Sequence, residues 1–271
     1  MHGDDPYAPL ASLYDAMASD PAIQAFYCEW ADSLLEAAER LGLRVRTLVD
    51  LACGTGNSTI PWLRQREWVV VGVDRSEAML REARRKSSRI DWYRRDLVDL
   101  DLPFRADAVT CHFDALNHVL SARSLQRAFH GVARLLNPGG LFQFDVNTGA
   151  ILEWLGRHEK LFRVGEHYFV AVNEYDRRRH LATFHQHWFV ARAGAGLRAR
   201  DLYEHREVVV QERAYPRGAL VAMLRRAGLR TLAIRAQRKV DGKPARLLFV
   251  TAREAAGRPG RRRERPPNRV R

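Results

Sequence analysis

Acidic residues at the ends of apolar runs give the clearest chemical signal in this chain of 271 residues. Asp50 interrupts the run Thr47–Leu51, and Asp74 ends the run Trp68–Val73, twenty positions after Gly54. A carboxylate at the end of a second strand, at about this spacing, can accept hydrogen bonds from a ribose diol. An acid just before a glycine turn repels a pyrophosphate and attracts an ammonium group. The pattern therefore favours a nucleoside ligand that carries a positive charge.

The segment Cys53–Gly56, with the sequence Cys-Gly-Thr-Gly, links the first run to a predicted helix. Its two glycines allow a sharp turn and a close approach of a ligand to the backbone. Asn57 and Ser58 are suitable helix caps, and Pro61 falls in the first turn, where proline is tolerated. Free backbone N–H groups at such a helix start favour a polar or anionic ligand. The turn lacks the third glycine of G-x-G-x-x-G, which disfavours an NAD-dependent oxidoreductase.

Five segments in order resemble the motifs of the class I S-adenosylmethionine-dependent methyltransferases. They are Val49–Asn57, Val71–Leu80, Arg95–Leu97, Asp107–Asp114 and Leu136–Phe142. Two shorter segments, Leu13–Asp15 (Leu-Tyr-Asp) and Glu212–Tyr215 (Glu-Arg-Ala-Tyr), resemble a bacterial small-molecule subgroup of that family. The resemblance covers roughly residues 7–252. It implies a Rossmann-like fold, S-adenosylmethionine as the cofactor, and transfer of a methyl group to a nitrogen or oxygen atom of a small molecule.

The resemblance also implies a role for each matched position. Asp50 would face the methionine ammonium of the cofactor, directly or through water, Asp74 would hold the ribose hydroxyls, and Asp96 would accept from the adenine amino group. The other implied cofactor contacts are Tyr14 in the N-terminal helices, Ala52, Gly54 and Gly56 at the turn, Arg75 and Met79 beside the ribose and adenine, Leu97 beside the ring, and Cys111 and Phe113 next to the sulfonium. Many members of the family have glycine in place of Ala52, whose methyl group narrows the approach.

The acceptor side is marked more weakly, for a chemical reason. Methyl transfer from a sulfonium is an in-line displacement with a charged leaving group, so the enzyme mostly supplies proximity and alignment. An amine acceptor must be deprotonated, and a hydroxyl or phenol needs a base or a metal. His118 is the candidate general base, since imidazole titrates near neutral pH. The alternative is a histidine at a helix start that bonds only to backbone, and Asp114 is expected to cap a turn.

No metal site is expected. His180, His185, His187 and His205 lie in one region, but carboxylate or cysteine partners at a fixed spacing are missing. The three cysteines are odd in number and widely spaced, which fits a reducing compartment. The chain has no apolar stretch of about eighteen residues and no signal-like N-terminus, so we expect a cytoplasmic protein without a membrane span.

The elements that position these residues alternate between strands and helices from residue 47 to residue 146, which predicts a parallel sheet with helices on both faces. Residues 160–214 are rich in aromatic and β-branched residues without a helical period, which predicts three antiparallel strands. The predicted fold class is therefore α/β, a Rossmann-like, doubly wound, mostly parallel seven-stranded sheet with an inserted antiparallel β meander. Its predicted parts are an N-terminal helical cap (1–45), the nucleoside-binding domain (46–159 and 215–252), the inserted meander as a substrate lid (160–214) and a disordered Arg-rich tail (253–271).

The net charge of +13 leaves two rival functions open. Residues 253–271 hold eight arginines and two glutamates, so the tail supplies +6 and the body +7. A basic balance raises affinity for nucleic acid, which suggests an RNA methyltransferase of the same fold. However, the fourth predicted strand is followed by Phe113-Asp114-Ala115-Leu116 and not by a base-flipping motif such as Asn-Pro-Pro-Tyr. The Arg261–Arg263 cluster could hold phosphate, but a solvated extension is favoured. The second rival is a noncatalytic protein that binds the nucleoside. We expect a monomer or a homodimer.

Overall fold

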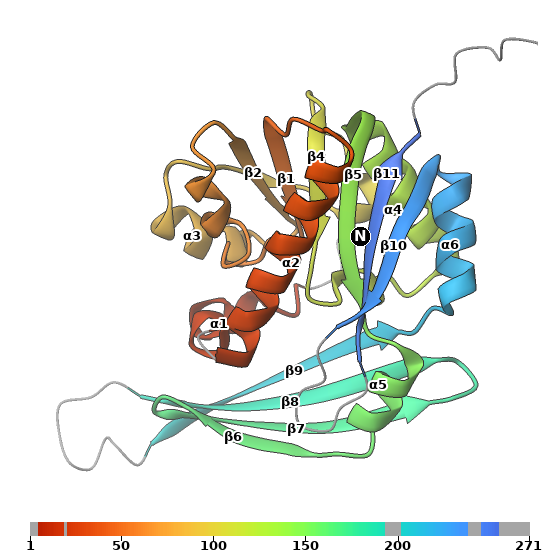
Figure 1. Ribbon diagram of the computed structural model, residues 1–271. Helices are drawn as coiled ribbons and strands as arrows, with labels where there is room; N and C mark the ends of the chain where they lie inside the picture. Colours follow the sequence, from red (N-terminus) through yellow and green to blue (C-terminus); the bar gives the residue numbers. More distant parts are fainter. Residues whose placement is uncertain (1–4, 19–20, 193–201, 238–244, 255–271) are drawn as a thin grey trace, which may run out of the picture.

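The computed structural model describes residues 5–18, 21–192, 202–237 and 245–254, which form two β-sheets (Figure 1). The main sheet has seven strands in the order β10-β11-β5-β4-β1-β2-β3. Their bounds are β1 (Thr47–Leu51), β2 (Val69–Asp74), β3 (Asp91–Arg94), β4 (Ala106–Cys111), β5 (Leu136–Val146), β10 (Leu229–Ala236) and β11 (Leu247–Arg253). Strands β1 to β5 are parallel and β11 is antiparallel to both neighbours, which confirms the predicted mostly parallel seven-stranded sheet.

Helices cover both faces of the main sheet, as expected for a doubly wound fold. On one face α4 (Ala122–Leu135) and α6 (Arg217–Arg226) bury an apolar stripe against β4, β5 and β11. On the other face α2 (Pro21–Arg40) packs beside the short 3-10 helix η2 (Ile60–Arg64). The remaining helical segments are η1 (Ala8–Leu10), α1 (Ala11–Ala18), α3 (Glu77–Lys86), η3 (Leu97–Asp99), η4 (Ala115–His118) and α5 (Gly149–Leu155).

The insertion forms a separate antiparallel sheet of four strands, one more than the three expected. They are β6 (Lys160–Val164), β7 (His167–Asp176), β8 (Leu181–Ala191) and β9 (Tyr203–Arg213), in sequential order. The additional strand is β6, which turns into β7 at Gly165, where φ is +60°. Side chains alternate along β8, so that Phe184 and Trp188 are buried on one face. That face packs against η1, α1 and α5 through an apolar cluster of its own.

Two further expectations differ from the structure. The helix expected after the glycine turn is only the 3-10 segment η2, since Ser58 and Thr59 bond to Asp50 and do not cap a helix. Strand β11 continues through Arg253, where the tail was expected to begin. Residues 255–271, including the Arg261–Arg263 cluster, lie outside the described residues.

The two sheets meet at the carboxyl ends of the parallel strands. In Figure 1 these ends point down towards α1 and the inserted sheet. Ligands of open α/β sheets bind at this edge, so the arrangement places the cap and the insertion next to the expected ligand site. Among the described residues, no helix has both the length and the apolar character needed to cross a bilayer.

Candidate functional site

A cavity of about 330 Å³ opens at the carboxyl ends of β1, β2 and β4. Its size suits a small ligand. The walls come from the glycine turn, from the segments that follow β2, β3 and β4, from η4 and from the N-terminal cap. The wall residues used below are Tyr7, Tyr14, Tyr27, Ala52, Gly54, Thr55, Asn57, Ser58, Asp74, Arg75, Met79, Asp96, Leu97, His112, Phe113 and His118.

Asp74 is held in place by two backbone groups. Its Oδ2 accepts a hydrogen bond from the Gly54 N–H at 2.8 Å, and its Oδ1 accepts from the Ser76 N–H at 2.8 Å. Ser76 in turn caps α3 by accepting from the Met79 N–H. Burial raises the pKa of the Asp74 carboxyl. Each carboxylate oxygen retains a lone pair, so the group can still accept hydrogen bonds from a diol in the cavity.

The glycine turn has two positions in the left-handed region at the cavity wall. Gly54 has a φ of +54°, and a Cβ there would meet no atom within 4 Å, which leaves the backbone open to a ligand. Ala52 has a φ of +53°, a conformation that costs a non-glycine residue energy. Gly56 is not part of the wall. A Cβ there would lie 2.6 Å from Cη2 of Trp92, so this glycine makes room for a packed tryptophan.

Asp50 does not line the cavity, so its expected contact with the methionine ammonium stays a prediction in the form that runs through water. Only 1% of the residue is exposed. Its Oδ2 accepts from the hydroxyls of Ser58 at 2.7 Å and Thr59 at 2.6 Å, and its Oδ1 accepts from the Thr110 hydroxyl at 2.7 Å. The carboxylate therefore fixes the loop after the glycine turn, and Ser58 is the residue of this group that reaches the wall.

Of the residues expected at the cavity from the ends of β3 and β4, Asp96, Leu97 and Phe113 line it and Cys111 does not. Asp96 and Leu97 are in the wall, and Asp96 Oδ1 accepts from the Val98 N–H at 2.8 Å. Cys111 is fully buried in the core and lies outside the wall, because the alternation of β4 turns it away. His112 and Phe113 take its place at the cavity. Arg75 and Met79 also line it, as expected.

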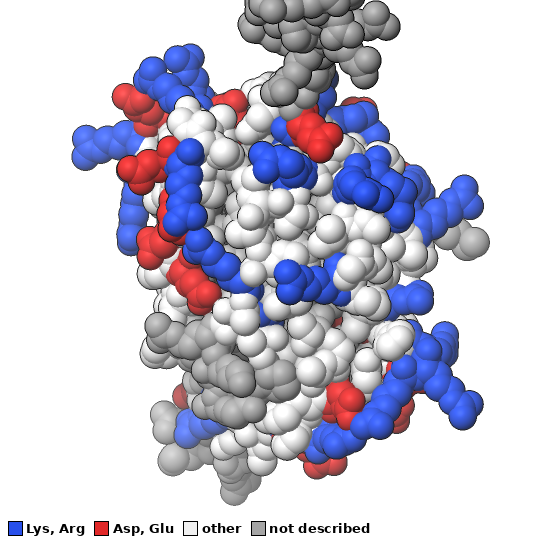
Figure 2. All heavy atoms as spheres, turned by 45° about the vertical axis from the view of Figure 1, so that its right-hand side comes forward, with Lys and Arg blue, Asp and Glu red and all other residues white. Residues whose placement is uncertain are grey.

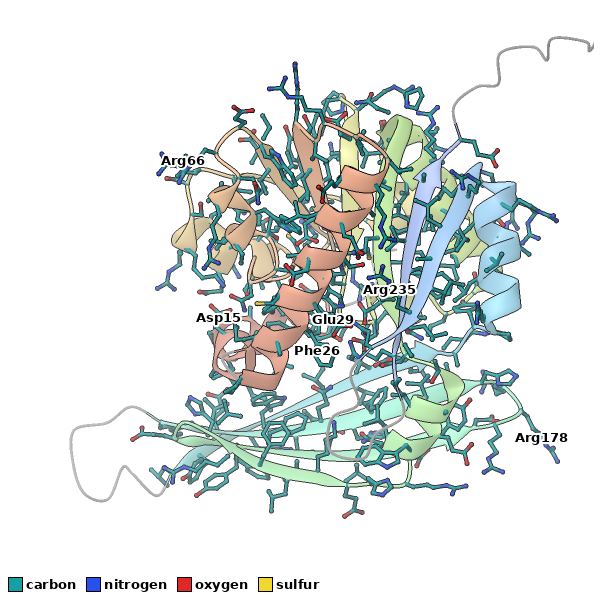
Figure 3. The ribbon with its side chains drawn as sticks, in the orientation of Figure 1. Asp15, Phe26, Glu29, Arg66, Arg178 and Arg235 are labelled. Carbon is teal, nitrogen blue, oxygen red and sulfur yellow. The ribbon has the colours of Figure 1, made fainter. Side chains whose placement is uncertain are left out.

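The N-terminal cap is attached to the glycine turn by Asp15. Figure 3 shows this residue on α1. Its Oδ1 accepts from the Thr55 hydroxyl at 2.6 Å and from the Asn57 amide at 2.9 Å, and Lys86 Nζ lies 2.9 Å from both carboxylate oxygens. Lys86 also donates to Asn57 Oδ1 at 2.8 Å. These contacts place Tyr14, the preceding residue of the Leu-Tyr-Asp segment, in the wall as expected.

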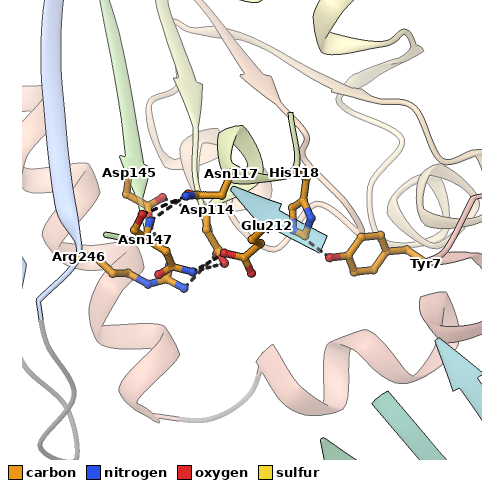
Figure 4. A network of polar contacts seen from close by, with 8 residues as sticks. All are labelled: Tyr7, Asp114, Asn117, His118, Asp145, Asn147, Glu212 and Arg246. Carbon is orange, nitrogen blue, oxygen red and sulfur yellow. Dashed lines mark hydrogen bonds and ion pairs between the residues drawn. The ribbon is translucent and has the colours of Figure 1, made fainter. Parts of the chain in front are cut away.

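His118 makes one contact at each ring nitrogen, and Figure 4 shows the one with Tyr7. Nδ1 lies 3.0 Å from the carbonyl oxygen of Gln211, and Nε2 lies 3.1 Å from the hydroxyl of Tyr7. A carbonyl only accepts, so Nδ1 carries the hydrogen and Nε2 accepts from Tyr7. Burial lowers the pKa of His118, so the ring is neutral at neutral pH. Nε2 is thus the atom that can take a proton, and sequence reasoning missed its partner Tyr7.

A buried polar network lies next to His118 and was largely missed by the sequence. Arg246 donates to Asp114 Oδ1 at 2.9 Å and to Asp145 Oδ2 at 2.8 Å. Asn147 Nδ2 donates to Asp114 Oδ2 at 2.7 Å and to Glu212 Oε2 at 2.8 Å. Asp114 makes no side-chain cap to η4, so its expected role as a turn cap is wrong. The Glu-Arg-Ala-Tyr segment was the available signal for Glu212.

Two groups of residues could be considered as metal ligands. The ligand atoms of Asp114, His118 and Glu212 lie within 4.8 Å of one another. Arg246 already bonds to Asp114, however, and a guanidinium beside a cation is repulsive. In the inserted sheet, His187 Nδ1 lies 3.1 Å from His205 Nε2, which is an ordinary hydrogen bond between two rings.

The strand order defines a Rossmann-like fold, and the cavity lies at the sheet edge where such folds bind their ligands. Residues 48–140 match the family model described as "Methyltransferase domain". "Putative methyltransferase YqeM" of Bacillus subtilis is 31% identical over 148 residues, which is 52% of this chain and 56% of that protein. A dTDP-4-amino-2,3,4,6-tetradeoxy-D-glucose N,N-dimethyltransferase of Saccharopolyspora spinosa is 30% identical over 50% of this chain and 53% of that protein. The chain thus spans about half the length of these curated relatives.

Solved structures match over nearly the whole chain. An S-adenosylmethionine-dependent methyltransferase from Clostridium acetobutylicum superposes with a TM-score of 0.76 at 25% identity, over 93% of this chain and all of that one. The sugar N-methyltransferase KedS8 from a Streptoalloteichus species shares the fold, with a TM-score of 0.69 at 22% identity over 89% and 91% of the two chains. Residues 48–140 therefore match a methyltransferase domain, and the chain has the fold of these S-adenosylmethionine-dependent methyltransferases.

Proposed function

We propose that the protein is an enzyme that uses S-adenosylmethionine to methylate a small-molecule acceptor at a nitrogen or oxygen atom. The observation that carries the proposal is Asp74, whose carboxylate is fixed by the N–H groups of Gly54 and Ser76 and faces the cavity. A diol-binding acid at this strand end is what a nucleoside requires. The match of residues 48–140 to a methyltransferase domain supports the choice of the nucleoside.

The cavity residues fit this cofactor. Gly54 leaves its backbone open, so a ligand can lie against the turn. Asp74 would hold the ribose hydroxyls, while Asp96 and Leu97 would border the adenine. Phe113 would border the sulfonium in place of the buried Cys111. When bound, the cofactor supplies an electrophilic methyl group on a positively charged sulfur, which leaves without acid assistance.

His118 is the residue that we assign to the acceptor. Its Nε2 is unprotonated and accepts from the hydroxyl of Tyr7. It can take a proton from an amine or a hydroxyl of the acceptor once that acceptor replaces the Tyr7 hydroxyl as its partner. A positioned base contributes roughly 10²–10⁴-fold to a rate. The alternative is a histidine that bonds only to backbone. It explains the contact of Nδ1 with the Gln211 carbonyl, but it does not explain why Nε2 contacts the side chain of Tyr7.

A small acceptor is favoured over RNA by the surroundings of the cavity. The cavity is lined by tyrosines of the cap and by residues of η4. The inserted sheet packs against the cap. On the face in Figure 2, groups of Lys and Arg residues are separated by uncharged surface, and Asp and Glu accompany them along the left edge and at the bottom. The names of the curated relatives, among them the amino-sugar N,N-dimethyltransferase, also support a small molecule.

The proposal can be tested with an isotopically labelled methyl donor and untargeted metabolomics. The wild type should transfer label to a small metabolite, and Asp74→Ala should not. Labelled RNA in a parallel incubation would favour the RNA alternative, and donor binding without any labelled product would favour the noncatalytic binder. The cytoplasmic location and the monomeric or homodimeric state remain predictions, which cell fractionation and light scattering test.

A further inference from the structure

The Glu-Arg-Ala-Tyr segment ends β9 and joins the inserted sheet to the loop that carries His118. The carbonyl of Gln211 accepts from His118 Nδ1 at 3.0 Å, and the carbonyl of Arg213 accepts from the Asn117 amide at 2.9 Å. The Arg213 guanidinium donates to the Leu120 carbonyl at 2.9 Å. The loop is thus held on both sides of His118 by neighbouring residues of one strand.

Glu212 lies in the middle of these contacts and is the least expected residue among them. Only 6% of it is exposed, although it is an acid. The amide of Asn147 donates to Glu212 and to Asp114, at 2.8 and 2.7 Å, and so brings the two carboxyl groups together. Buried acids are rare unless they are paired with a cation or protonated.

The charges around Glu212 indicate whether it is paired with a cation or protonated. Arg246 is the buried cation, and its two terminal nitrogens bond to Asp114 and Asp145. These two carboxylates already exceed the charge of the guanidinium, so an ionised Glu212 would add a second uncompensated negative charge. Burial and Asp114 both raise the pKa of Glu212, and a hydrogen bond from Glu212 lowers the pKa of Asp114. The other titratable groups that face this pair are His118 of η4, Tyr7 of the N-terminal segment and Tyr14 of α1.

We propose that Glu212 is a positioning residue of the acceptor site, which acts as a neutral carboxylic acid that donates a hydrogen bond to Asp114. The contact fixes Asp114, and with it the start of η4 and the ring of His118. The acid and the carboxylate together carry a single negative charge beside His118, which stabilises the imidazolium formed when the ring takes a proton. The role of His118 as a base rests on the proposed function, whereas the state of Glu212 does not.

The proposal distinguishes between two substitutions at one position. Glu212→Gln keeps a donor for Asp114 and an acceptor for Asn147, so it mimics the neutral acid. It should melt within about 2 °C of the wild type and keep kcat within about 3-fold, since little of the interaction is lost. Glu212→Ala leaves both partners without their contact and should lower kcat about 10-fold or more, with the KM for the methyl donor unchanged. Glu207→Gln, on the exposed outer face of β9, is the matched control.

A second readout does not need activity. In the NMR titration of His118, Glu212→Gln should leave the pKa of the ring unchanged, whereas Asp114→Asn should lower it, because the carboxylate that favours the imidazolium is lost. This result is expected even if no methyl transfer is found. The proposal is overturned if Glu212→Gln behaves like Glu212→Ala, which would mean that an ionised Glu212 is needed. It is also overturned if a chelator abolishes wild-type activity and Mn²⁺ or Zn²⁺ restores it, which would indicate a cation bound by Asp114, His118 and Glu212.

Discussion

Replacement of Asp74 by alanine is the most direct test of the cofactor site. The carboxylate accepts from Gly54 and Ser76 at 2.8 Å each, and its remaining lone pairs face the cavity. Hydrogen bonds to a charged group contribute about 1.5–3 kcal/mol each, less the cost of removing the carboxylate from water. We therefore expect donor binding to weaken by about 1–3 kcal/mol, which is about 5- to 150-fold in Kd.

Isothermal titration calorimetry with S-adenosylmethionine measures this change. Asp91→Ala removes an exposed acid at the start of the neighbouring strand β3 and should leave the Kd unchanged. Circular dichroism at the same temperature shows whether each variant is folded, because Asp74 also helps to hold the glycine turn. A folded Asp74→Ala variant with wild-type affinity would refute the assignment of the ribose to this acid.

Three further predictions concern the cap, the turn and the base. Lys86→Met removes the cation that bridges Asp15 and Asn57. The partly exposed ion pair contributes about 1 kcal/mol or less after solvent screening. Its loss should nevertheless let the cap open more often, and stopped-flow fluorescence should show faster release of the methyl donor. Ala52→Gly removes the strain of a non-glycine residue in the left-handed region, at a cost in chain entropy. Urea denaturation should therefore show an increase of about 0.5–1 kcal/mol in the free energy of unfolding. A decrease would show that the backbone of Ala52 is not strained. His118 has a pKa below its usual value of about 6.5, so the activity of the wild type, which needs the unprotonated ring, should fall only as the pH drops below about 6.5. His118→Gln should lower kcat about 10²–10⁴-fold and remove this acid limb, and an unchanged profile would exclude the base.

The sequence predicted the main sheet well because its order and direction follow from local patterns. Alternating buried strands and amphipathic helices leave few topologies open. The inserted sheet was predicted with three strands because β6 is short and mostly exposed, so Leu161 and Phe162 gave no burial pattern. Gly165, between two aromatic runs, was the missed turn signal.

The site was predicted in part, and each miss has its own physical cause. Asp74 and Asp96 reach the cavity because they end or follow strands that stop at its edge. Asp50 lies within β1, where its carboxylate is enclosed by hydroxyls from two other segments. Cys111 is the last residue of β4 and His112 follows it, so their side chains lie on different sides of the strand end. Sequence periodicity does not place a strand end to within one residue. Contacts between distant segments, such as Tyr7 with His118, leave no local pattern at all.

Two short segments at opposite ends of the chain perform the same task. Asp15, from the N-terminal Leu-Tyr-Asp segment, bonds the cap to the glycine turn on the cofactor side. On the acceptor side, Arg213 of the late Glu-Arg-Ala-Tyr segment bonds the inserted sheet to Asn117 and Leu120 in the loop of η4. Glu212 of the same segment bonds it to Asn147 after β5. In-line transfer needs both reactants aligned at once, and a strand-end loop alone is not rigid enough to align them. Each additional element is attached directly to a loop of the main sheet, and the N-terminal segment also reaches the acceptor side, because the hydroxyl of Tyr7 contacts His118 and the inserted sheet packs against the cap. The contacts that align the donor and the acceptor are therefore joined through the cap.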